Sequence, residues 1–254
     1  MWWVILGILS YLAVPLLLPV FAGQKRQNYL GEAVPTGLGL AFVLPGSFMM
    51  VARLQKEEYA GLFALALLFF AVLGAIDDVH GEEGRKGFRG HFSIRQLSTG
   101  ALKAWGGVAF SLAIASSLGT GIWQIALNGL NMALMANFLN LLDLRPGRAG
   151  KTFVLLGLAV FFLRPDILGP LFGMVWAVGG FLFWDLRRSA MMGDSGSNAL
   201  GAVLGLACAI SFPLVGRILL CLVLLGLNAL SERISFSEVI ESNRLLRYFD
   251  QLGR

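Results

Sequence analysis

Four short polar segments interrupt an otherwise apolar chain, and their residue types suit the binding of a metal ion and of phosphate groups. These segments are Ala75–Asp78, Asn137–Asp143, Arg145–Arg148 and Gly193–Ser197. Mg²⁺ takes oxygen ligands, keeps several waters and is commonly held by one or two carboxylates together with substrate phosphates. The pattern therefore predicts metal-assisted chemistry on phosphate groups, in which the protein offsets the charge that develops during transfer.

Asp194 is the first candidate for a metal ligand. The glycines around it let backbone N–H groups approach an anion, and the apolar segment that follows would present a helix N-terminus to that anion. Asp77 and Asp78 are adjacent, so they cannot point the same way on one helix. One carboxylate is expected to face the metal or an acceptor group, and the other to act as a base or a structural partner. Which of the two does which is open at this stage.

The composition places these residues in a membrane protein. Of the 254 residues, 57% are hydrophobic and only 14% are charged, which is more apolar surface than a soluble core of ordinary size can bury. The first segment, residues 2–22, is uncharged and long enough to cross a hydrocarbon layer of roughly 30 Å. No basic segment precedes it, so we expect a retained span and not a cleaved signal peptide.

We predict an all-α, polytopic membrane bundle of nine transmembrane helices. The apolar segments lie at 2–22, 35–52, 59–76, 97–118, 121–142, 150–163, 167–184, 198–212 and 214–230. Fifteen of the twenty basic residues then fall in the loops of one side and in the tail. The positive-inside rule places that side in the cytoplasm, together with the acidic segments and the C-terminus, and the N-terminus outside. Residues 1–230 would form a catalytic bundle in the plasma membrane, and residues 231–254 a cytoplasmic amphipathic tail.

Several cations have two interpretations. Arg145, Arg148 and Lys151 could bind donor phosphates, or they could be ordinary anchors at the cytoplasmic face. Lys103, inside an apolar segment, either points at a phosphate in the site or extends its amine to the interface. Apolar residues in the tail recur at helical spacing among charges, which predicts an interfacial helix or a cover over the site.

Four motifs, in this order and spacing, make the chain similar to the polyprenyl-phosphate N-acetylhexosamine-1-phosphate transferases. They are Val-Pro-Thr-Gly-Leu-Gly at 34–39, the Asp77-Asp78 pair, Asn-x-x-Asn-x-x-Asp at 137–143, and Met-Gly-Asp-Ser-Gly-Ser at 192–197 with a later Leu-Gly. This family, which is also called glycosyltransferase family 4, includes the bacterial phospho-N-acetylmuramoyl-pentapeptide transferase. The resemblance covers residues 34–201 and implies a helical fold of ten or eleven spans with a cytoplasmic cleft.

The resemblance also implies an activity and roles for individual residues. It implies Mg²⁺ dependence, a nucleotide-sugar donor, and a polyprenyl phosphate acceptor that reaches the site through a groove between helices. Asp194 would ligate Mg²⁺, Asp77 and Asp78 would engage the acceptor phosphate and the metal, and Asn140 and Asp143 would line the nucleotide-diphosphate site. The candidate catalytic residues are Asp77, Asp78 and Asp143, the candidate metal ligands are Asp194 and Asp78, and the candidate substrate-binding residues are Thr36, Lys103, Asn137, Asn140, Arg145, Arg148 and Lys151.

The chain departs from the family pattern in two places. Relatives follow the Asn-x-x-Asn-x-x-Asp motif with a glycine and a second aspartate, whereas residues 144–151 of this chain contain cations instead. The histidine-rich cytoplasmic loop of relatives is expected to be missing, because the only histidines are His80 and His91, for which exposed loop positions are expected. Since that loop helps to recognise the sugar in relatives, the identity of the sugar is open.

We therefore expect transfer of a sugar-1-phosphate from a nucleotide sugar, UDP-linked, to a polyprenyl phosphate for cell-envelope glycan synthesis. Two alternatives remain: a catalytically silent protein that binds polyprenyl phosphate or acts as a scaffold, and a transporter of lipids or anions. A transporter would more naturally carry its acids near the membrane midplane and repeat its two halves, and the sequence has no such repeat. Membrane lipids are expected partners, nucleic acid is not, and a homodimer stays open.

Overall fold

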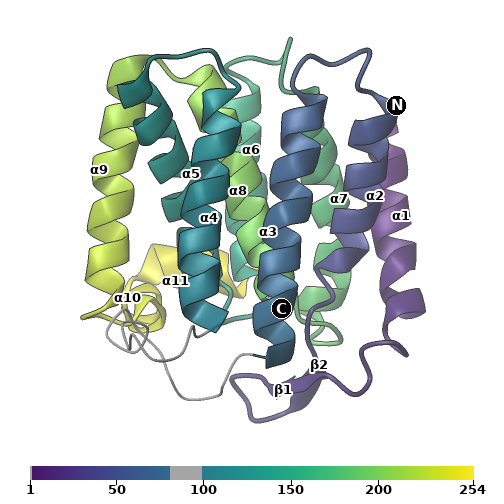
Figure 1. Cartoon of the computed structure of the whole chain (residues 1–254). Coiled ribbons are helices and arrows are strands. Elements are labelled where there is room, and N and C mark those ends of the chain that lie inside the picture. Colours follow the sequence, from purple (N-terminus) through teal and green to yellow (C-terminus); the bar gives the residue numbers. More distant parts are fainter. Residues whose placement is uncertain (1, 81–98) are drawn as a thin grey trace.

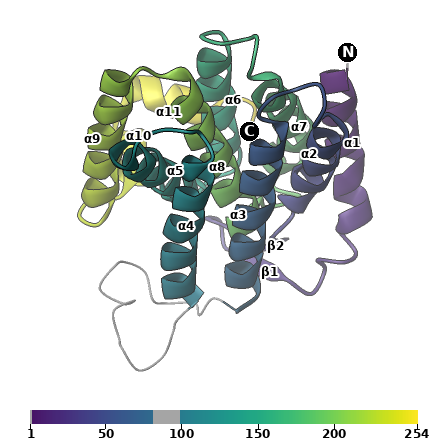
Figure 2. The ribbon, with the colours of Figure 1, turned by 45° about the horizontal axis from the view of Figure 1, so that its top comes forward.

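The structure, a computed structural model of the chain, is a helical bundle with one small hairpin at one end (Figure 1 and Figure 2). It describes residues 2–80 and 99–254, with side chains from residue 104 onward in the second part, so His91 and the side chain of Lys103 lie outside it. The elements are α1 (Trp2–Leu17), β1 (Lys25–Gln27), β2 (Ala33–Pro35), α2 (Leu40–Ala52), α3 (Ala60–His80), α4 (Thr99–Ser116), α5 (Ile122–Leu142), α6 (Arg148–Phe161), α7 (Gly169–Leu186), α8 (Gly193–Ser211), α9 (Leu214–Ser231), α10 (Phe236–Ser242) and α11 (Arg244–Gln251).

The prediction of an all-α membrane fold is confirmed. Each predicted apolar segment contains one helix, from α1 to α9. Within the described residues, α3, α5, α7 and α9 are each long and apolar enough to cross a membrane, and α1, α2 and the described part of α4 are shorter apolar helices. The number of spans and the sides of the two termini stay predictions.

Two helices begin about five residues away from the predicted starts of their segments. The segment 35–52 is helical only from Leu40, because Ala33–Pro35 pairs antiparallel with Lys25–Gln27 in a short hairpin that the apolar pattern does not indicate. The segment predicted to begin at residue 198 is helical from Gly193. Asp194 therefore lies in the first turn of α8 and not in a loop before it.

The hairpin holds the start of α2 beside the start of α8. The N–H of Met191 donates to the carbonyl of Pro35 at 2.9 Å, and the N–H of Leu38 donates to the carbonyl of Met191 at 3.1 Å. The N–H of Gly39 donates to the carbonyl of Met192 at 2.9 Å. Because these backbone bonds join distant parts of the chain, they fix the segment that carries Asp194 from outside its own helix.

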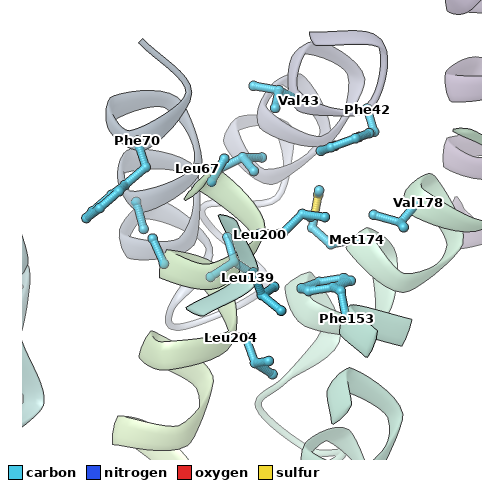
Figure 3. Packing of buried hydrophobic residues seen from close by; sticks show 14 of the residues in the cluster. Phe42, Val43, Leu67, Phe70, Leu139, Phe153, Met174, Val178, Leu200 and Leu204 are labelled. Carbon is cyan, nitrogen blue, oxygen red and sulfur yellow. The ribbon is translucent and has the colours of Figure 1, made fainter. Parts of the chain in front are cut away.

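Helix α8 is buried along almost its whole length and forms the centre of the core. Gly201 faces Ala136 of α5, and Gly205 faces Met132 of the same helix. Small residues let membrane helices approach closely, and packing then replaces the hydrophobic drive that lipid does not supply. Figure 3 shows larger buried side chains of the neighbouring helices gathered near Leu200, namely Phe42, Leu67, Leu139, Phe153 and Met174.

Replacing Gly201 by alanine is expected to destabilise the protein. A Cβ here would overlap the Cα of Ala136, so α5 and α8 would have to separate, and overpacking of this kind costs about 1–3 kcal/mol. Gly179→Ala is the matched control, because a Cβ there meets nothing within 4 Å and alanine favours the helix. Thermal unfolding in detergent measures both variants. Equal melting temperatures for the two would contradict the close α5–α8 packing.

Candidate active site

The predicted acidic residues lie where helix ends meet, at the end of the bundle that carries the hairpin (Figure 1). Asp78 is near the end of α3, Asn140 is near the end of α5, and Asp143 follows α5 directly. Asp194 is the second residue of α8. Segments that are far apart in the sequence are thus brought to one place.

The carboxylate of Asp78 binds the N-terminus of α8. Its Oδ1 accepts a hydrogen bond from the N–H of Asp194 at 3.0 Å, and its Oδ2 accepts one from the N–H of Ser195, also at 3.0 Å. The first N–H groups of a helix have no partner within the helix, and a negative charge there is also favoured by the helix dipole. Asp78 therefore caps α8 from another helix, and its side chain is buried as a result.

Two glycines make this contact sterically feasible. Gly193 has a left-handed φ of 72°, and a Cβ on it would lie 2.7 Å from Oδ2 of Asp78. One turn before Asp78 on α3, a Cβ on Gly74 would overlap the carbonyl of Asp194. Any larger residue at either position would push α3 and α8 apart. The Met-Gly-Asp motif thus needs its glycine for the backbone conformation and for this close approach.

Asn140 and Ser197 orient Asp194. The Nδ2 of Asn140 donates to Oδ2 of Asp194 at 3.4 Å, and the Oγ of Ser197 donates to Oδ1 of Asn140 at 3.1 Å. The Ser197 hydroxyl also contacts the carbonyl of Gly193 at 3.0 Å. The two motifs Asn-x-x-Asn-x-x-Asp and Met-Gly-Asp-Ser-Gly-Ser therefore contact each other directly.

Asp143 lies close enough to the other carboxylates to be affected by their charge. Burial and the negative charges of Asp185, Asp194 and Asp78 raise the pKa of Asp143 well above its ordinary value, and a hydrogen bond from the Gly193 backbone partly opposes this. Carboxylates gathered in this way repel one another unless a cation or a proton is bound among them. The cluster is therefore suited to hold a divalent cation.

Asp185 belongs to the same cluster, although the sequence analysis did not single it out. It lies at the end of α7, is buried, and accepts a hydrogen bond from the N–H of Gly147 at 2.8 Å. The signal that could have found it is the one that marks Asp77 and Asp78, namely an acid at the end of an apolar segment that is predicted to face the cytoplasm. Asp185 lies outside all four motifs, so the sequence pattern does not mark it as a site residue.

Other predicted residues of the site have different surroundings. Asp77 is next to Asp78 on α3, and Arg26 of β1 donates to the backbone carbonyls of both at 3.3 Å and 3.2 Å. Thr36 is buried in the turn between β2 and α2. Asn137 donates to the side chain of Asn228 on α9, so the structure joins it to the α5–α9 contact.

The three cations that follow Asp143 all contact the C-terminal tail. Arg148 pairs with Asp250, Arg145 pairs with Glu241 at 2.9 Å, and Lys151 donates to backbone carbonyls at the end of α11. Their binding of a donor phosphate stays a prediction. The tail contacts the bundle beside the Asp143 segment, and a cover over the site stays a prediction.

The oxygen atoms present fit a magnesium ion better than a metal held by protein side chains alone. In the part of the chain that the structure describes, no group of three or more histidine, cysteine, aspartate or glutamate side chains is arranged to hold a metal. Mg²⁺ needs only one or two carboxylates when substrate phosphates complete its shell. Asp194, with Asp143 nearby, offers this donor set.

Comparison with known proteins agrees with the motif pattern. The family model for glycosyl transferase family 4 matches residues 60–212. The chain belongs to this family. A curated relative, the phospho-N-acetylmuramoyl-pentapeptide-transferase of Thermosynechococcus vestitus, is 31% identical over 230 residues, and the match covers 79% of this chain and 60% of that relative. The chain thus matches about 60% of the relative's length.

The region matched by the glycosyl transferase family 4 model runs from the start of α3 to just past the end of α8. It contains the four acids of the cluster and also Asp77 and Asn140. Thr36 and the tail lie outside it. The family match therefore covers the part of the chain in which the carboxylates meet.

At a pH above the raised pKa of Asp143, where its carboxylate is ionised, replacing Asp143 by asparagine is expected to raise the melting temperature of the metal-free protein, because the change removes one of several mutually repelling charges. Asp166→Asn is the control, since Asp166 is exposed and pairs only at the surface, where such pairs contribute little. Thermal unfolding in EDTA and then in Mg²⁺ measures the effect, and Mg²⁺ should stabilise the wild type more than Asp143→Asn. A lower melting temperature for Asp143→Asn in EDTA would contradict the repulsion.

Proposed function

We propose that the protein transfers a sugar-1-phosphate from a nucleotide sugar, UDP-linked, to a polyprenyl phosphate at the cytoplasmic face of the plasma membrane, with Mg²⁺, for cell-envelope glycan synthesis. The observation that carries this proposal is the meeting of Asp78, Asn140, Asp143 and Asp194 in a member of glycosyl transferase family 4. The relative, whose name is phospho-N-acetylmuramoyl-pentapeptide-transferase, supports a phosphosugar as the transferred group. The polyprenyl phosphate acceptor rests on the family resemblance of the motifs.

The residues of the cluster divide the work in this proposal. Asp194, oriented by Asn140, would hold Mg²⁺, and Asp143 would add a second carboxylate beside it. When bound, the metal would supply positive charge to the donor diphosphate. Both oxygens of Asp78 already accept backbone hydrogen bonds, so we assign Asp78 the structural part of the acidic pair and Asp77 the part that faces the acceptor.

The reaction itself is a displacement at phosphorus. An oxygen of polyprenyl phosphate would attack the β-phosphorus of the nucleotide sugar, a new P–O bond would form, and the bond to the bridging oxygen would break. The nucleoside monophosphate would leave with that oxygen. The protein would act by positioning the two phosphates in line and by offsetting charge, which are the main contributions to phosphoryl transfer.

An apolar groove offers a place for the acceptor's chain. It lies between α2 and α3, has a volume of about 360 Å³, and its lining includes Leu40, Leu68, Val72 and Ile76. It ends at His80, within one turn of Asp77 on the same helix. An isoprenoid chain in this groove would keep its phosphate at the end of α3.

Asp194→Asn should abolish turnover, by at least about 100-fold, because loss of a group that offsets transition-state charge typically costs that much or more. The assay incubates purified protein with undecaprenyl phosphate, Mg²⁺ and a panel of UDP-sugars and measures release of uridine monophosphate. Asp78→Asn should also be severely impaired. His80→Ala should be mild, because no histidine base is expected, and Asp166→Asn, at an exposed position outside the acidic cluster, is the control.

Folding of each variant is checked by its melting temperature, which Asp194→Asn should leave nearly unchanged because the amide has the same shape. Turnover of Asp194→Asn within about threefold of wild type at saturating Mg²⁺, under about 1 kcal/mol in activation free energy, would rule out this mechanism. The silent-binder and transporter interpretations would then take precedence.

A further inference from the structure

The C-terminal tail is bound to the bundle through a buried ion pair. Nε and Nη2 of Arg148 donate to Oδ1 and Oδ2 of Asp250 at 2.7 Å and 3.1 Å, and Nη1 donates to the hydroxyl of Ser237 at 2.9 Å. Both charged residues are buried, with 4% and 8% of their surface exposed. This two-point geometry fixes the orientation of α11 as well as its distance from α6.

The contact between the tail and α6 also includes hydrogen bonds to backbone carbonyls, both in the tail and in the loop before α6. Lys151 donates to the carbonyls of Phe249, Asp250 and Leu252, at 2.9, 2.6 and 3.1 Å, so one amine binds carbonyls at the end of α11 that the helix itself leaves unpaired. In return, Nε of Arg254 donates to the carbonyl of Pro146 at 2.8 Å. The tail therefore contacts both the start of α6 and the loop before it.

Asp250 is suited to stay ionised in this pair. Burial raises its pKa, but the hydrogen bond and charge of Arg148, together with the charge of Arg254, outweigh burial and hold the pKa of Asp250 below its ordinary value. A buried guanidinium without such a partner is strongly unfavourable. Removing the Asp250 carboxylate should therefore release Arg148 from its buried position.

The loop between α5 and α6, residues 143–147, is held from three sides. At its start, Asp143 accepts a hydrogen bond from the backbone of Gly193. At its end, Gly147, with a left-handed φ of 74°, donates to Asp185 of α7. The third side is the tail, through Pro146 and the neighbouring Arg148. Because the loop is short, loss of one of these contacts would change the position of Asp143.

We propose that the tail is a positioning element of the active site, in which Asp250, acting through Arg148, fixes the loop that carries Asp143. The proposal rests on the function proposed above. In this proposal, Asp250 touches neither the substrate nor the metal. Arg148 then serves the tail and is not a ligand of the donor phosphate.

The test compares Asp250→Ala and Asp250→Glu with wild type and with Glu238→Gln. Glutamate at 250 keeps the carboxylate and should partly restore the contact, whereas Glu238 is an exposed acid on α10 of the same tail and serves as the matched control. Hydrogen exchange of the amides at 143–148 is the first readout. Asp250→Ala should raise their exchange about tenfold or more, Asp250→Glu should raise it less, and Glu238→Gln should leave it at the wild-type rate.

Steady-state kinetics give the second readout. Asp250→Ala should lower kcat about tenfold or more and change KM for the nucleotide sugar less than about threefold, because the carboxylate near the metal is displaced while the donor contacts remain. Asp250→Glu should recover part of kcat. Arg148→Gln should behave like Asp250→Ala, since both break the same pair.

Three outcomes would overturn the proposal. Unchanged exchange at 143–148 in Asp250→Ala would mean that the tail does not fix the loop. A rise in KM for Arg148→Gln alone would assign Arg148 to the donor phosphate, and faster turnover in Asp250→Ala would make the tail an inhibitor. If the wild type turns over no nucleotide sugar, the proposed function fails, while the exchange measurement still decides whether the tail positions the loop.

Discussion

The contact between the Asp78 carboxylate and the first N–H groups of α8 is the constraint on which the rest of the site depends. It joins the ends of two helices that the sequence places far apart, and it sets the position of Asp194 through the backbone of that residue. The contact is electrostatic and directional, but it exists only because Gly74 and Gly193 allow α3 and α8 to approach closely. Small residues along α8 extend this close packing through the core.

Much of the fold and part of the site follow from local patterns. Apolar length predicts the helices, and the distribution of basic residues in the loops predicts that Asp77, Asp78, Asp143 and Asp194 share one end of the bundle. The structure places the last three of these acids at that end, in contact or close enough for their charges to interact. Their roles were beyond sequence reasoning, because whether an acid at a helix end caps another helix or faces a ligand depends on contacts between segments that no local pattern records.

The features that the sequence does not predict also depend on contacts between distant segments. Asp185 has no motif around it, and its importance comes from Gly147, a partner on another helix. The hairpin of β1 and β2 is too short to show a period, and it is held by backbone bonds to the segment before α8. The sequence predicts an amphipathic tail, but several basic residues nearby look alike in their local sequence. Only the structure shows that Arg148 is the one that pairs with the tail.

The cations that follow Asp143 have a structural role in these contacts. A buried arginine at the start of α6 requires an acid, and the tail provides one in Asp250. Acids on α7 and in the tail thus flank the loop, while α8 supplies backbone donors on the remaining side. The cluster of carboxylates costs stability by repulsion, and the contacts that surround it offset that cost by fixing every helix end that carries an acid. In the proposed function, these contacts would hold the carboxylates in place for Mg²⁺ and a diphosphate, so that the site needs little rearrangement when they bind.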